Sequence, residues 1–224
     1  MKIIINEKQE KCLHKFFLKE AMGDMFSFDE LKKINSFKGK YNYCKKTLGP
    51  TQGRGSSRVC FQLSDNKILK LALNQKGLAQ NATELDWGLQ SYDVVPEIYP
   101  ESDTDNYTFI CSEYVLPAKE SDFEHVFGFD FHTFCKCITA FYNCYTPHAT
   151  VAISPMDDDS LSTLLDENED LNSFYYYMTD YQPPLGDMLS LSSYGMTNRS
   201  GVPQIVLLDS GLNYDVFNKF YKRR

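Results

Sequence analysis

The sequence predicts an α+β fold, in which an antiparallel, β-rich N-terminal lobe with one key helix precedes a reduced helical C-terminal lobe. Three observations predict this fold. In the first half, short apolar segments alternate with turn-forming residues, as antiparallel strands do. A helical pattern follows the third of these segments, and beyond Pro117 most apolar residues recur at helical spacing. The length of 224 residues and the hydrophobic fraction of 42% allow a sizeable buried core.

Three parts of the chain are expected, at residues 1–40, 41–117 and 118–224. The first part is an N-terminal helical segment. In it, apolar residues recur at helical spacing over residues 6–21. Ser27 followed by Glu30 is the capping-box pattern, which predicts that a second, short helix begins there.

The β-rich lobe is expected to hold five strands. They are assigned to residues 41–48, 58–63, 67–73, 95–99 and 107–116. A loop rich in Gly and Ser at residues 49–57 and a tight turn at residues 64–66 would join the first three strands into an antiparallel meander. The one key helix of this lobe is expected at residues 77–89, directly after the third strand.

The reduced helical lobe is expected to contain two longer helices followed by a small hairpin. The helices are assigned to residues 129–145 and 161–181, the strands to residues 194–197 and 204–208, and the turn between the strands to residues 198–201. Three consecutive aspartates at residues 157–159 are typical of a solvated helix start. Pro183 and Pro184 would end the second helix because proline cannot continue the helical hydrogen-bond pattern.

Charge is distributed unevenly along the chain. Residues 1–76 carry 16 Lys and Arg against 7 Asp and Glu, whereas residues 77–224 carry 7 against 23, for a net charge of −7. The basic part would suit phosphates or nucleic acid, and the acidic part would suit metal ions or would simply keep the chain in solution. Ordinary solvated faces account for the same charges equally well.

Seven cysteines occur without a repeated spacing. The only close pair, Cys135 and Cys137, lacks the second pair that a zinc site requires. Free thiols in a reducing compartment are therefore expected, with no disulfide partner and a cytoplasmic location. The N-terminal apolar run is too short for a signal peptide, and no stretch approaches the roughly 18 apolar residues of a membrane span, so no membrane association is expected.

The loop between the first two predicted strands has the composition of a phosphate-binding loop. It contains Gly53, Gly55 and Ser56. Glycine allows the backbone to turn freely and its N–H groups to approach a phosphate closely. The alternative is a glycine-rich hairpin loop that binds no ligand.

Lys70 lies inside an apolar strand. Alternation places Ile68, Lys70 and Ala72 on one face of this strand. An inward-pointing ammonium requires an anion, such as a phosphate or a carboxylate, whereas an edge-strand lysine would face solvent. Glu84 in the following helix is the expected carboxylate, and Asp86 is the competing partner.

Asp209 follows an apolar strand and precedes Gly211. A carboxylate at the end of a strand, followed by a glycine turn, is a usual way to hold a divalent metal over a triphosphate. Gly186 and Asp187 precede it across the short hairpin. Ordinary turns are the alternative at both places.

Taken in order, these motifs resemble those of the protein-kinase superfamily over roughly residues 41–215. Gly53, Gly55 and Arg58 are similar to its glycine-rich loop, and residues 113–116 are similar to the hinge that binds adenine. The resemblance implies that ATP is bound by Gly53, Gly55, Ser56, Lys70, Glu113 and Val115, and that Mg²⁺ is bound by Asp209. It also implies three catalytic roles: Lys70 orients the phosphates, Glu84 holds Lys70, and Asp187 takes the proton of the acceptor.

Three features depart from the family pattern. The second metal ligand, an asparagine, would fall near Ser192 or Ser193, and Leu185 takes the place of the catalytic-loop histidine. Only 13 residues follow Gly211, which leaves no room for the helices that usually bind a peptide substrate.

The leading expectation is a protein that binds Mg-ATP and transfers a phosphoryl group to a protein or a small molecule. The alternative is a catalytically inactive kinase-like module that binds a partner protein or serves as a virion or host-takeover component. The retained Lys70 and Asp209 favour the first, and the missing asparagine and short C-terminal part favour the second. Residues 1–9 are similar to the opening of many small tailed-phage proteins, which implies a viral origin and a location in the host cytoplasm.

Overall fold

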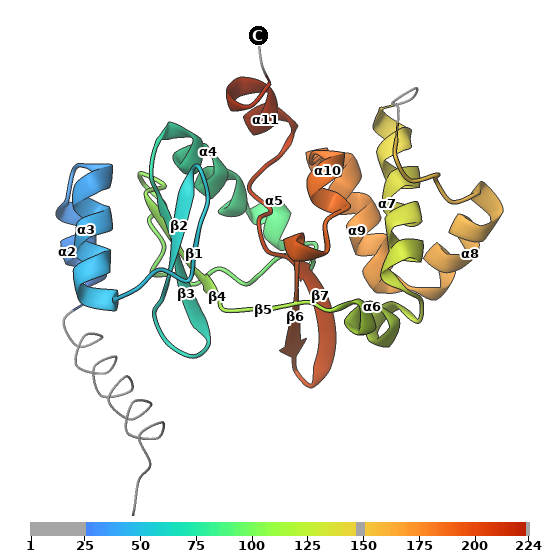
Figure 1. The fold of residues 1–224 in the computed structure, drawn as a ribbon, viewed down its shortest axis with the longest axis horizontal. Coiled ribbons are helices and arrows are strands. Elements are labelled where there is room, and N and C mark those ends of the chain that lie inside the picture. Colours follow the sequence, from blue (N-terminus) through green and yellow to red (C-terminus); the bar gives the residue numbers. More distant parts are fainter. Residues whose placement is uncertain (1–25, 147–150, 223–224) are drawn as a thin grey trace, which may run out of the picture. The chain divides into compact units, whose positions relative to one another are not determined.

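The computed structural model describes residues 26–146 and 151–222, and the helix expected at residues 6–21 lies outside this part of the chain. The described residues form two compact units (Figure 1). Unit 1 consists of residues 26–78 and 99–112, and unit 2 consists of the described residues in 79–98 and 113–222. Each unit contains helices and one antiparallel sheet, so the predicted α+β class is confirmed.

Two helices open unit 1, and both begin at a serine that caps them. The first is α2 (Phe28–Lys33), where the Ser27 hydroxyl accepts a hydrogen bond from the Glu30 backbone at 3.4 Å. The second is α3 (Phe37–Leu48), which Ser36 caps in the same way. The prediction that a helix begins at Ser27 is therefore confirmed.

The prediction of a strand at residues 41–48 is wrong, because these residues belong to α3. Tyr41, Cys44 and Leu48 are spaced three and four residues apart, which places them on one face of a helix. That face packs against strands of the unit 1 sheet, and Cys44 is fully buried there. Residues 41–48 also have the aromatic-rich composition of a strand, and the helix is indicated only when the capping residue Ser36 is taken into account.

The unit 1 sheet has four strands in the order β1-β2-β3-β4. They are β1 (Gly53–Arg54), β2 (Arg58–Gln62), β3 (Lys67–Ala72) and β4 (Phe109–Glu113). The last residue of β4, Glu113, is already part of unit 2. The first three are consecutive and antiparallel, as predicted, but β1 comes from the predicted loop rather than from residues 41–48.

The strand predicted at residues 95–99 is not formed, and only a single bridge occurs there, at Ile98. Pro96 lies within this segment and has no backbone N–H to donate to a ladder. The strand predicted at residues 107–116 is shortened to β4, and a separate short strand, β5 (Leu116–Pro117), follows it.

The two faces of the unit 1 sheet are chemically different. Leu69 and Leu71 of β3 pack with Val59 and Phe61 of β2 in a fully buried core against α2 and α3. Because side chains alternate along a strand, Lys70 projects from the opposite face, as the sequence predicts. Figure 1 shows α3 beside the sheet.

Helix α4 (Gln75–Glu84) begins in unit 1 and ends in unit 2. The helix predicted at residues 77–89 is broken after Glu84, because Asp86 caps a separate short helix, α5 (Trp87–Gln90). The Asp86 carboxylate accepts a hydrogen bond from the Gly88 backbone at 3.0 Å, which begins the new helix in a new direction.

The remaining elements all belong to unit 2. The helices are α6 (Glu120–Phe127), α7 (Phe131–Tyr145), α8 (Asp158–Glu167), α9 (Glu169–Tyr181), α10 (Leu185–Met188), the 3₁₀ turn η1 (Leu191–Ser193) and α11 (Tyr214–Phe220). The prediction at 161–181 becomes α8 and α9, which Asn168 separates by ending one helix and capping the next. Asp157 caps α8, so the acidic run does lie at a helix start.

The unit 2 sheet has the order β5-β6-β7, in which β6 (Tyr194–Arg199) and β7 (Val202–Leu207) form the predicted hairpin. Ser200 and Gly201 connect the two strands with φ of 54° and 86°. Positive φ at both central residues is characteristic of a type I′ turn, which matches the twist of a two-residue hairpin.

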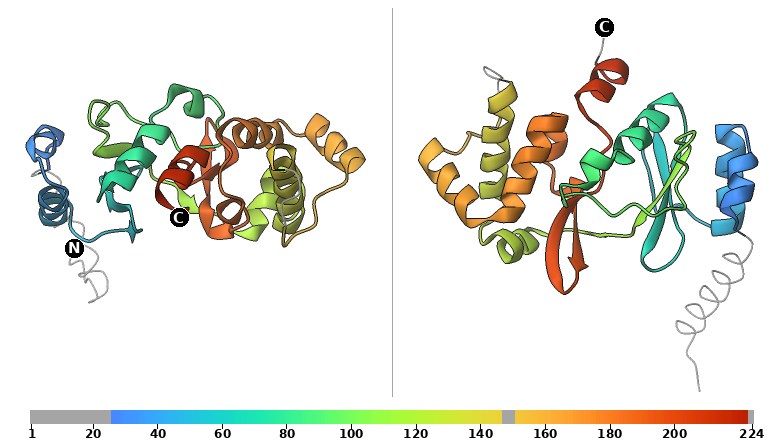
Figure 2. Two further views of the ribbon diagram at one scale, coloured as in Figure 1. Left: turned by 90° about the horizontal axis from the view of Figure 1, so that it is seen from above. Right: turned by 180° about the vertical axis from the view of Figure 1, so that it is seen from behind.

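Aromatic side chains fill the core of unit 2. Phe134 of α7 contacts Phe123, Phe174 and Tyr194, and all four rings are fully buried. Figure 2 shows α7, α8 and α9 close together, in agreement with the contacts between α7 and α9 and between α8 and α9. This core supports the β6–β7 hairpin and the segment that follows it.

Two further sequence expectations concern membranes and disulfides. Within residues 26–146 and 151–222, no helix is both long and apolar enough to span a membrane. The six cysteines in these ranges carry thiols, and no disulfide joins any two of them. Cys12, the seventh, lies outside the described residues.

Candidate functional site

The glycine-rich segment forms the tip of the β1–β2 hairpin in unit 1. The Gly55 N–H donates to the Arg58 carbonyl at 2.9 Å, and the Ser56 carbonyl accepts from the Asn74 amide at 2.9 Å. A Cβ added to Gly53 would meet no atom within 4 Å, and one added to Gly55 would come no closer than 3.8 Å to any neighbour. Crowding within the chain therefore does not require glycine at either position. Residues 53–56 are exposed, and the Gly55 N–H is already used within the hairpin.

Lys70 lies in the same cross-strand row as Gly53. Gly53 is opposite Cys60, and Cys60 is opposite Lys70, so the three residues share one face of the sheet. The spacing of neighbouring strands puts Gly53 and Lys70 about 10 Å apart. The Lys70 side chain is only 6% exposed, and a buried ammonium requires negative or polar partners. Unit 1 thus brings two of the predicted phosphate-binding features together.

Glu84, the last residue of α4, is 1% exposed and lies in unit 2. Its Oε1 accepts a hydrogen bond from the Gly211 backbone N–H at 3.2 Å. A Cβ added to Gly211 would lie 2.4 Å from the Gln80 carbonyl oxygen, a distance that real atoms do not adopt. Only glycine therefore permits this close packing of the segment after β7 against α4. The pairing of Glu84 with Lys70 stays a prediction.

Asp86, the competing partner predicted for Lys70, serves a structural role in unit 2. Besides capping α5, its carboxylate accepts a hydrogen bond from the Tyr181 hydroxyl at 3.1 Å. This bond ties α5 to the end of α9. Asp86 therefore acts as a cap and an anchor within unit 2.

Asp209 lies two residues beyond the end of β7 and is exposed. The backbone N–H of the preceding Leu208 donates to the Ser193 carbonyl at 2.8 Å, which joins the predicted metal-binding segment to the predicted catalytic-loop segment. Ser210, the next residue, is almost fully buried. This anchoring on both sides fixes the backbone of Asp209.

Asp187 lies in α10 and interacts electrostatically with Asp209. The pKa of the Asp187 carboxyl is raised above its ordinary value because burial disfavours its charged form and the Asp209 carboxylate repels a second negative charge. Two nearby carboxylates of this kind favour a divalent cation or a shared proton. In the described parts of the chain, no group of three His, Cys, Asp or Glu side chains could hold a metal ion. A magnesium ion that keeps waters and phosphate oxygens as ligands requires only one or two carboxylates.

Tyr177 of α9 belongs to the same neighbourhood and was missed by the sequence reasoning. Its ring is fully buried, and its hydroxyl makes no hydrogen bond to any described residue. The pKa of this hydroxyl lies well above its ordinary value because of burial first and then the negative charges of Asp209 and Glu84. A run of three tyrosines at residues 175–177 gave no signal that distinguished this one from its neighbours.

Two serines lie where the second metal ligand of the resembled family would fall. Both belong to η1, and the Ser192 hydroxyl forms a hydrogen bond with the Ser190 hydroxyl at 2.8 Å. A neutral hydroxyl is a weaker magnesium ligand than an amide or carboxylate oxygen. Ser192 is therefore a poor candidate for a metal ligand.

The predicted hinge residues have mainly structural contacts. The Glu113 carboxylate accepts hydrogen bonds from the Thr197 hydroxyl and from Arg199 Nη2, the latter at 2.9 Å. Burial, the largest single effect, would raise its pKa, but these two hydrogen bonds and the Arg199 charge bring the pKa below its ordinary value of 4.5. Val115 is buried beside Gly195, where an added Cβ would lie 2.5 Å from Val115 Cγ1. The Glu113 backbone N–H also donates to the Glu97 carbonyl at 2.8 Å, so both its side chain and its N–H have partners within unit 2.

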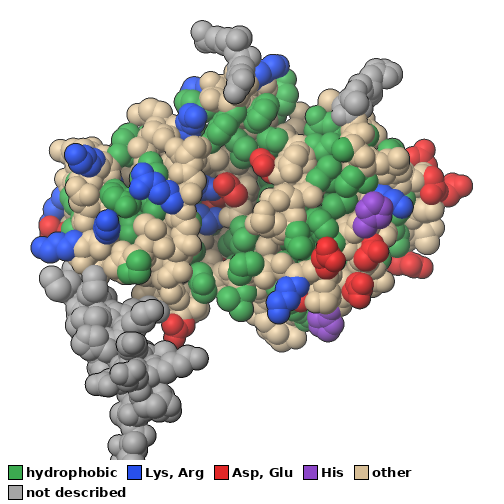
Figure 3. All heavy atoms as spheres, viewed as in Figure 1, with side chains coloured by type: hydrophobic (Ala, Val, Ile, Leu, Met, Phe, Trp, Pro, Cys, Tyr) green, Lys and Arg blue, Asp and Glu red, His purple; other side chains and the backbone are tan. Residues whose placement is uncertain are grey.

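The described surface retains the charge asymmetry of the sequence. On the face drawn in Figure 3, Lys and Arg side chains are frequent on unit 1, and Asp and Glu side chains are frequent on unit 2. Helix α3 alone carries four lysines and no acidic residue. The predicted site residues fall into two groups: Gly53, Gly55, Ser56 and Lys70 in unit 1, and Glu84, Glu113, Val115, Asp187 and Asp209 in unit 2.

Comparison of the chain with protein-family models, with curated proteins and with solved structures finds no match.

Proposed function

We propose that the protein binds a magnesium nucleoside triphosphate, ATP in the first instance, through a protein-kinase-like site. The observation that carries the proposal is the fixed segment 209–211 in unit 2. Asp209 presents an exposed carboxylate, and Gly211 is held to the buried Glu84 by a hydrogen bond of 3.2 Å. A carboxylate on an anchored backbone loses little freedom when it binds a metal.

The arrangement in unit 1 supports the phosphate-binding half of the proposal. The hairpin tip with Gly53, Gly55 and Ser56 exposes backbone that is free of steric crowding. Lys70 projects from the same face of the sheet as Gly53. The exposed backbone of this tip and the Lys70 ammonium are proposed to bind the phosphates.

Asp187 is the proposed general base for phosphoryl transfer. A general base works best when its pKa is near the working pH, and the pKa of Asp187 is displaced upward by burial and by Asp209. It would accept the proton of the attacking hydroxyl while the γ-phosphoryl group passes to that oxygen and ADP leaves. The acceptor is proposed to be a hydroxyl of a protein or a small molecule.

An inactive, partner-binding module is the second candidate function. The observation that favours it is η1, where Ser192 takes the place of a stronger metal ligand and is already bonded to Ser190. The exposed Trp87, the only tryptophan of the chain, offers a large apolar contact to a partner because its side chain is 86% exposed. In this case the protein would bind a partner protein, and it would not need to bind a nucleotide or transfer a phosphoryl group.

A thermal shift assay tests the proposal. A ligand that binds only the folded state at 100 times its Kd stabilises that state by about 2.7 kcal/mol. We expect millimolar Mg-ATP to raise the Tm of the wild type by several degrees, and ATP without magnesium to raise it less. Asp209→Asn should lose the difference between the two conditions. No shift with either Mg-ATP or Mg-GTP would contradict the proposal.

A further inference from the structure

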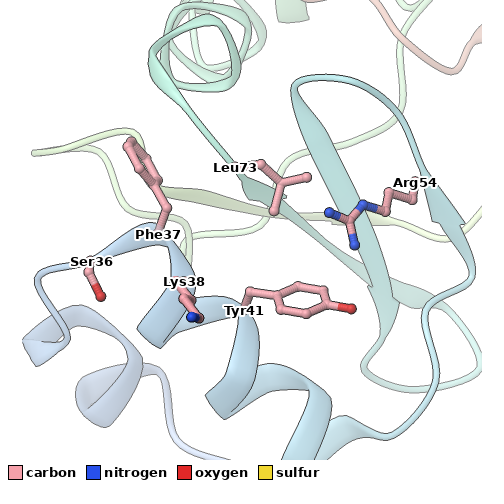
Figure 4. A pocket seen from close by; sticks show the side chains of 6 residues that line it. All are labelled: Ser36, Phe37, Lys38, Tyr41, Arg54 and Leu73. Carbon is pink, nitrogen blue, oxygen red and sulfur yellow. The ribbon is translucent and has the colours of Figure 1, made fainter.

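A pocket of about 480 Å³ lies in unit 1 between α3 and the sheet (Figure 4). It is lined by Ser36, Phe37, Lys38, Tyr41, Arg54 and Leu73. Two of these six side chains are cations and none is acidic. The pocket therefore combines positive charge with aromatic surface.

Arg54 and Tyr41 form the centre of this pocket. The Arg54 guanidinium lies over the Tyr41 ring, 5.2 Å from the ring centroid, and Figure 4 shows the two side chains on the same side of the pocket. Arg54 is opposite Val59 in the sheet, so it projects toward α3. A guanidinium plane and a tyrosine ring are both surfaces on which an unpaired base can stack.

Lysines extend this charge along α3. Lys38, Tyr41 and Lys45 are spaced three and four residues apart and therefore share one face of the helix. Lys38 and Lys45 are both exposed and lie about 10 Å apart along the helix axis. The two lysines are therefore far enough apart to contact different phosphates of one strand.

Lys40 does not contribute to this surface. Its ammonium donates to the Leu31 carbonyl at 2.6 Å at the end of α2, and the side chain is only 4% exposed. Lys38 and Lys45 are exposed to solvent, whereas Lys40 is buried and stabilises the contact between α2 and α3. Only the exposed lysines of α3 are therefore counted as part of the binding surface.

The pocket is distinct from the proposed nucleotide site. Arg54 projects from the face of the sheet that α3 covers, together with Leu69 and Leu71. Lys70 projects from the opposite face. A ligand of the pocket would therefore not be the ATP proposed above, and the inference does not depend on that proposal.

From this geometry we infer that unit 1 binds single-stranded nucleic acid along α3. Lys38, Lys45 and Arg54 contact phosphates, and a base stacks against the Tyr41–Arg54 pair. A duplex or an anionic lipid surface would use the positive charges alone, whereas an aromatic ring between the cations adds a contact that only an unpaired base exploits.

Fluorescence anisotropy of the full chain with a labelled 20-nucleotide oligo-dT tests the inference. Three phosphate contacts predict binding about 20-fold weaker at 200 mM than at 50 mM salt, and the double variant Lys38→Ala, Lys45→Ala should reduce this loss to about threefold. Lys32→Ala, which removes an exposed lysine of α2 outside the pocket, should leave the salt dependence unchanged. Arg54→Ala should weaken binding roughly tenfold at 50 mM salt.

Tyr41→Phe and Tyr41→Leu separate stacking from charge. The phenylalanine variant should bind oligo-dT like the wild type, and the leucine variant should bind it several-fold more weakly. Circular dichroism checks that each variant is folded, and should Tyr41→Leu fail to fold, the exposed Arg54 supplies the decisive variant. The inference is overturned by no binding at 50 mM salt, by an equal effect of Lys32→Ala, or by stronger binding of a DNA duplex or of vesicles rich in anionic lipid.

Discussion

Glu84 and Gly211 are 127 residues apart in the chain, and the Oε1 of Glu84 accepts a hydrogen bond from the N–H of Gly211 at 3.2 Å. This bond joins the end of α4 to the segment that carries Asp209. Because both groups are buried, each would lose a partner that water cannot replace if the other were removed. The resemblance predicts that Glu84 pairs with Lys70, which stays a prediction. Within unit 2, Glu84 holds the segment of residues 209–211 to the end of α4.

Replacement of Glu84 therefore should destabilise the protein. Glu84→Ala leaves the Gly211 N–H buried without an acceptor and should lower the free energy of unfolding by about 1–3 kcal/mol. Glu84→Gln keeps an oxygen acceptor at the same place and should cost less. Urea denaturation followed by circular dichroism measures both, and equal losses in the two variants would show that the hydrogen bond to Gly211 is not what Glu84 contributes.

Gly211→Ala should destabilise the protein for a steric reason. The added Cβ would lie 2.4 Å from the Gln80 carbonyl oxygen, so the segment must move away from α4, at a cost of about 1–3 kcal/mol. Gly186→Ala is the matched control, because a Cβ there would meet no atom within 4 Å. Thermal unfolding should show a clear fall in Tm for the first variant and almost none for the second. A fall of the same size in both would contradict the close packing against α4.

Local signals in the sequence account for the parts of the fold that were predicted correctly. The hairpin turn requires positive φ at Gly201, and a glycine at that place indicates a turn directly in the sequence. The alternation in β3 likewise placed Lys70 on the face opposite Leu69 and Leu71. Both features depend on neighbours within a few residues, which a single sequence contains.

The errors and omissions arise where distant residues decide the structure. Residues 41–48 became a helix because Ser36 caps it and because Tyr41, Cys44 and Leu48 pack against the sheet. The order of motifs along the chain predicts that Asp187 lies near Asp209, but no local feature of the sequence indicates that Tyr177 is buried near it. The hydrogen bond between Glu84 and Gly211 likewise could not be predicted from local sequence, because the two residues are 127 positions apart.

The Glu113–Arg199 pair should make stability depend on pH. In the folded protein, the pKa of the Glu113 carboxyl lies below its ordinary value of 4.5. The ion pair with Arg199 therefore stabilises the fold above pH 4.5, and this contribution is lost as the pH falls through the folded pKa of Glu113. Glu113→Gln should therefore cost about 1–3 kcal/mol at pH 7. The difference between wild type and variant should shrink below pH 4.5. A difference that is the same at both pH values would contradict a role for the charge.

Asp209→Asn should lower the pKa of Asp187. Removal of the neighbouring carboxylate removes the repulsion that disfavours ionised Asp187, whereas the effect of burial remains. The pKa should fall in the variant but stay above the ordinary value of 3.8. Carboxyl chemical shifts recorded by NMR over a pH titration report this directly. An unchanged pKa would show that the charge of Asp209 does not affect Asp187 and would contradict this account.

Cys144 should be the most reactive of the cysteines that the structure describes. It is exposed, whereas burial raises the pKa of Cys44 and Cys137 to about 12 and that of Cys111 and Cys135 to about 11, which lowers their thiolate fraction. Reaction of the folded Cys12→Ser variant, which lacks the cysteine outside the described residues, with a thiol reagent should show a fast phase that adding Cys144→Ser removes. Mass spectrometry of the unfolded wild type should find all seven thiols alkylated. A fast phase that persists in the variant would contradict the assignment.

Isothermal titration of the wild type, Lys70→Ala and Asp209→Asn with Mg-ATP tests the central proposal most directly. The wild type should release or absorb heat with a single saturable transition, and binding should weaken when magnesium is omitted. Lys70→Ala should lose a charge-assisted contact of about 1.5–3 kcal/mol, which is roughly 10- to 150-fold in Kd. Asp209→Asn should bind equally with and without magnesium. If the wild type gives no heat with millimolar Mg-ATP or Mg-GTP, the nucleotide-binding proposal is wrong and the partner-binding module stands.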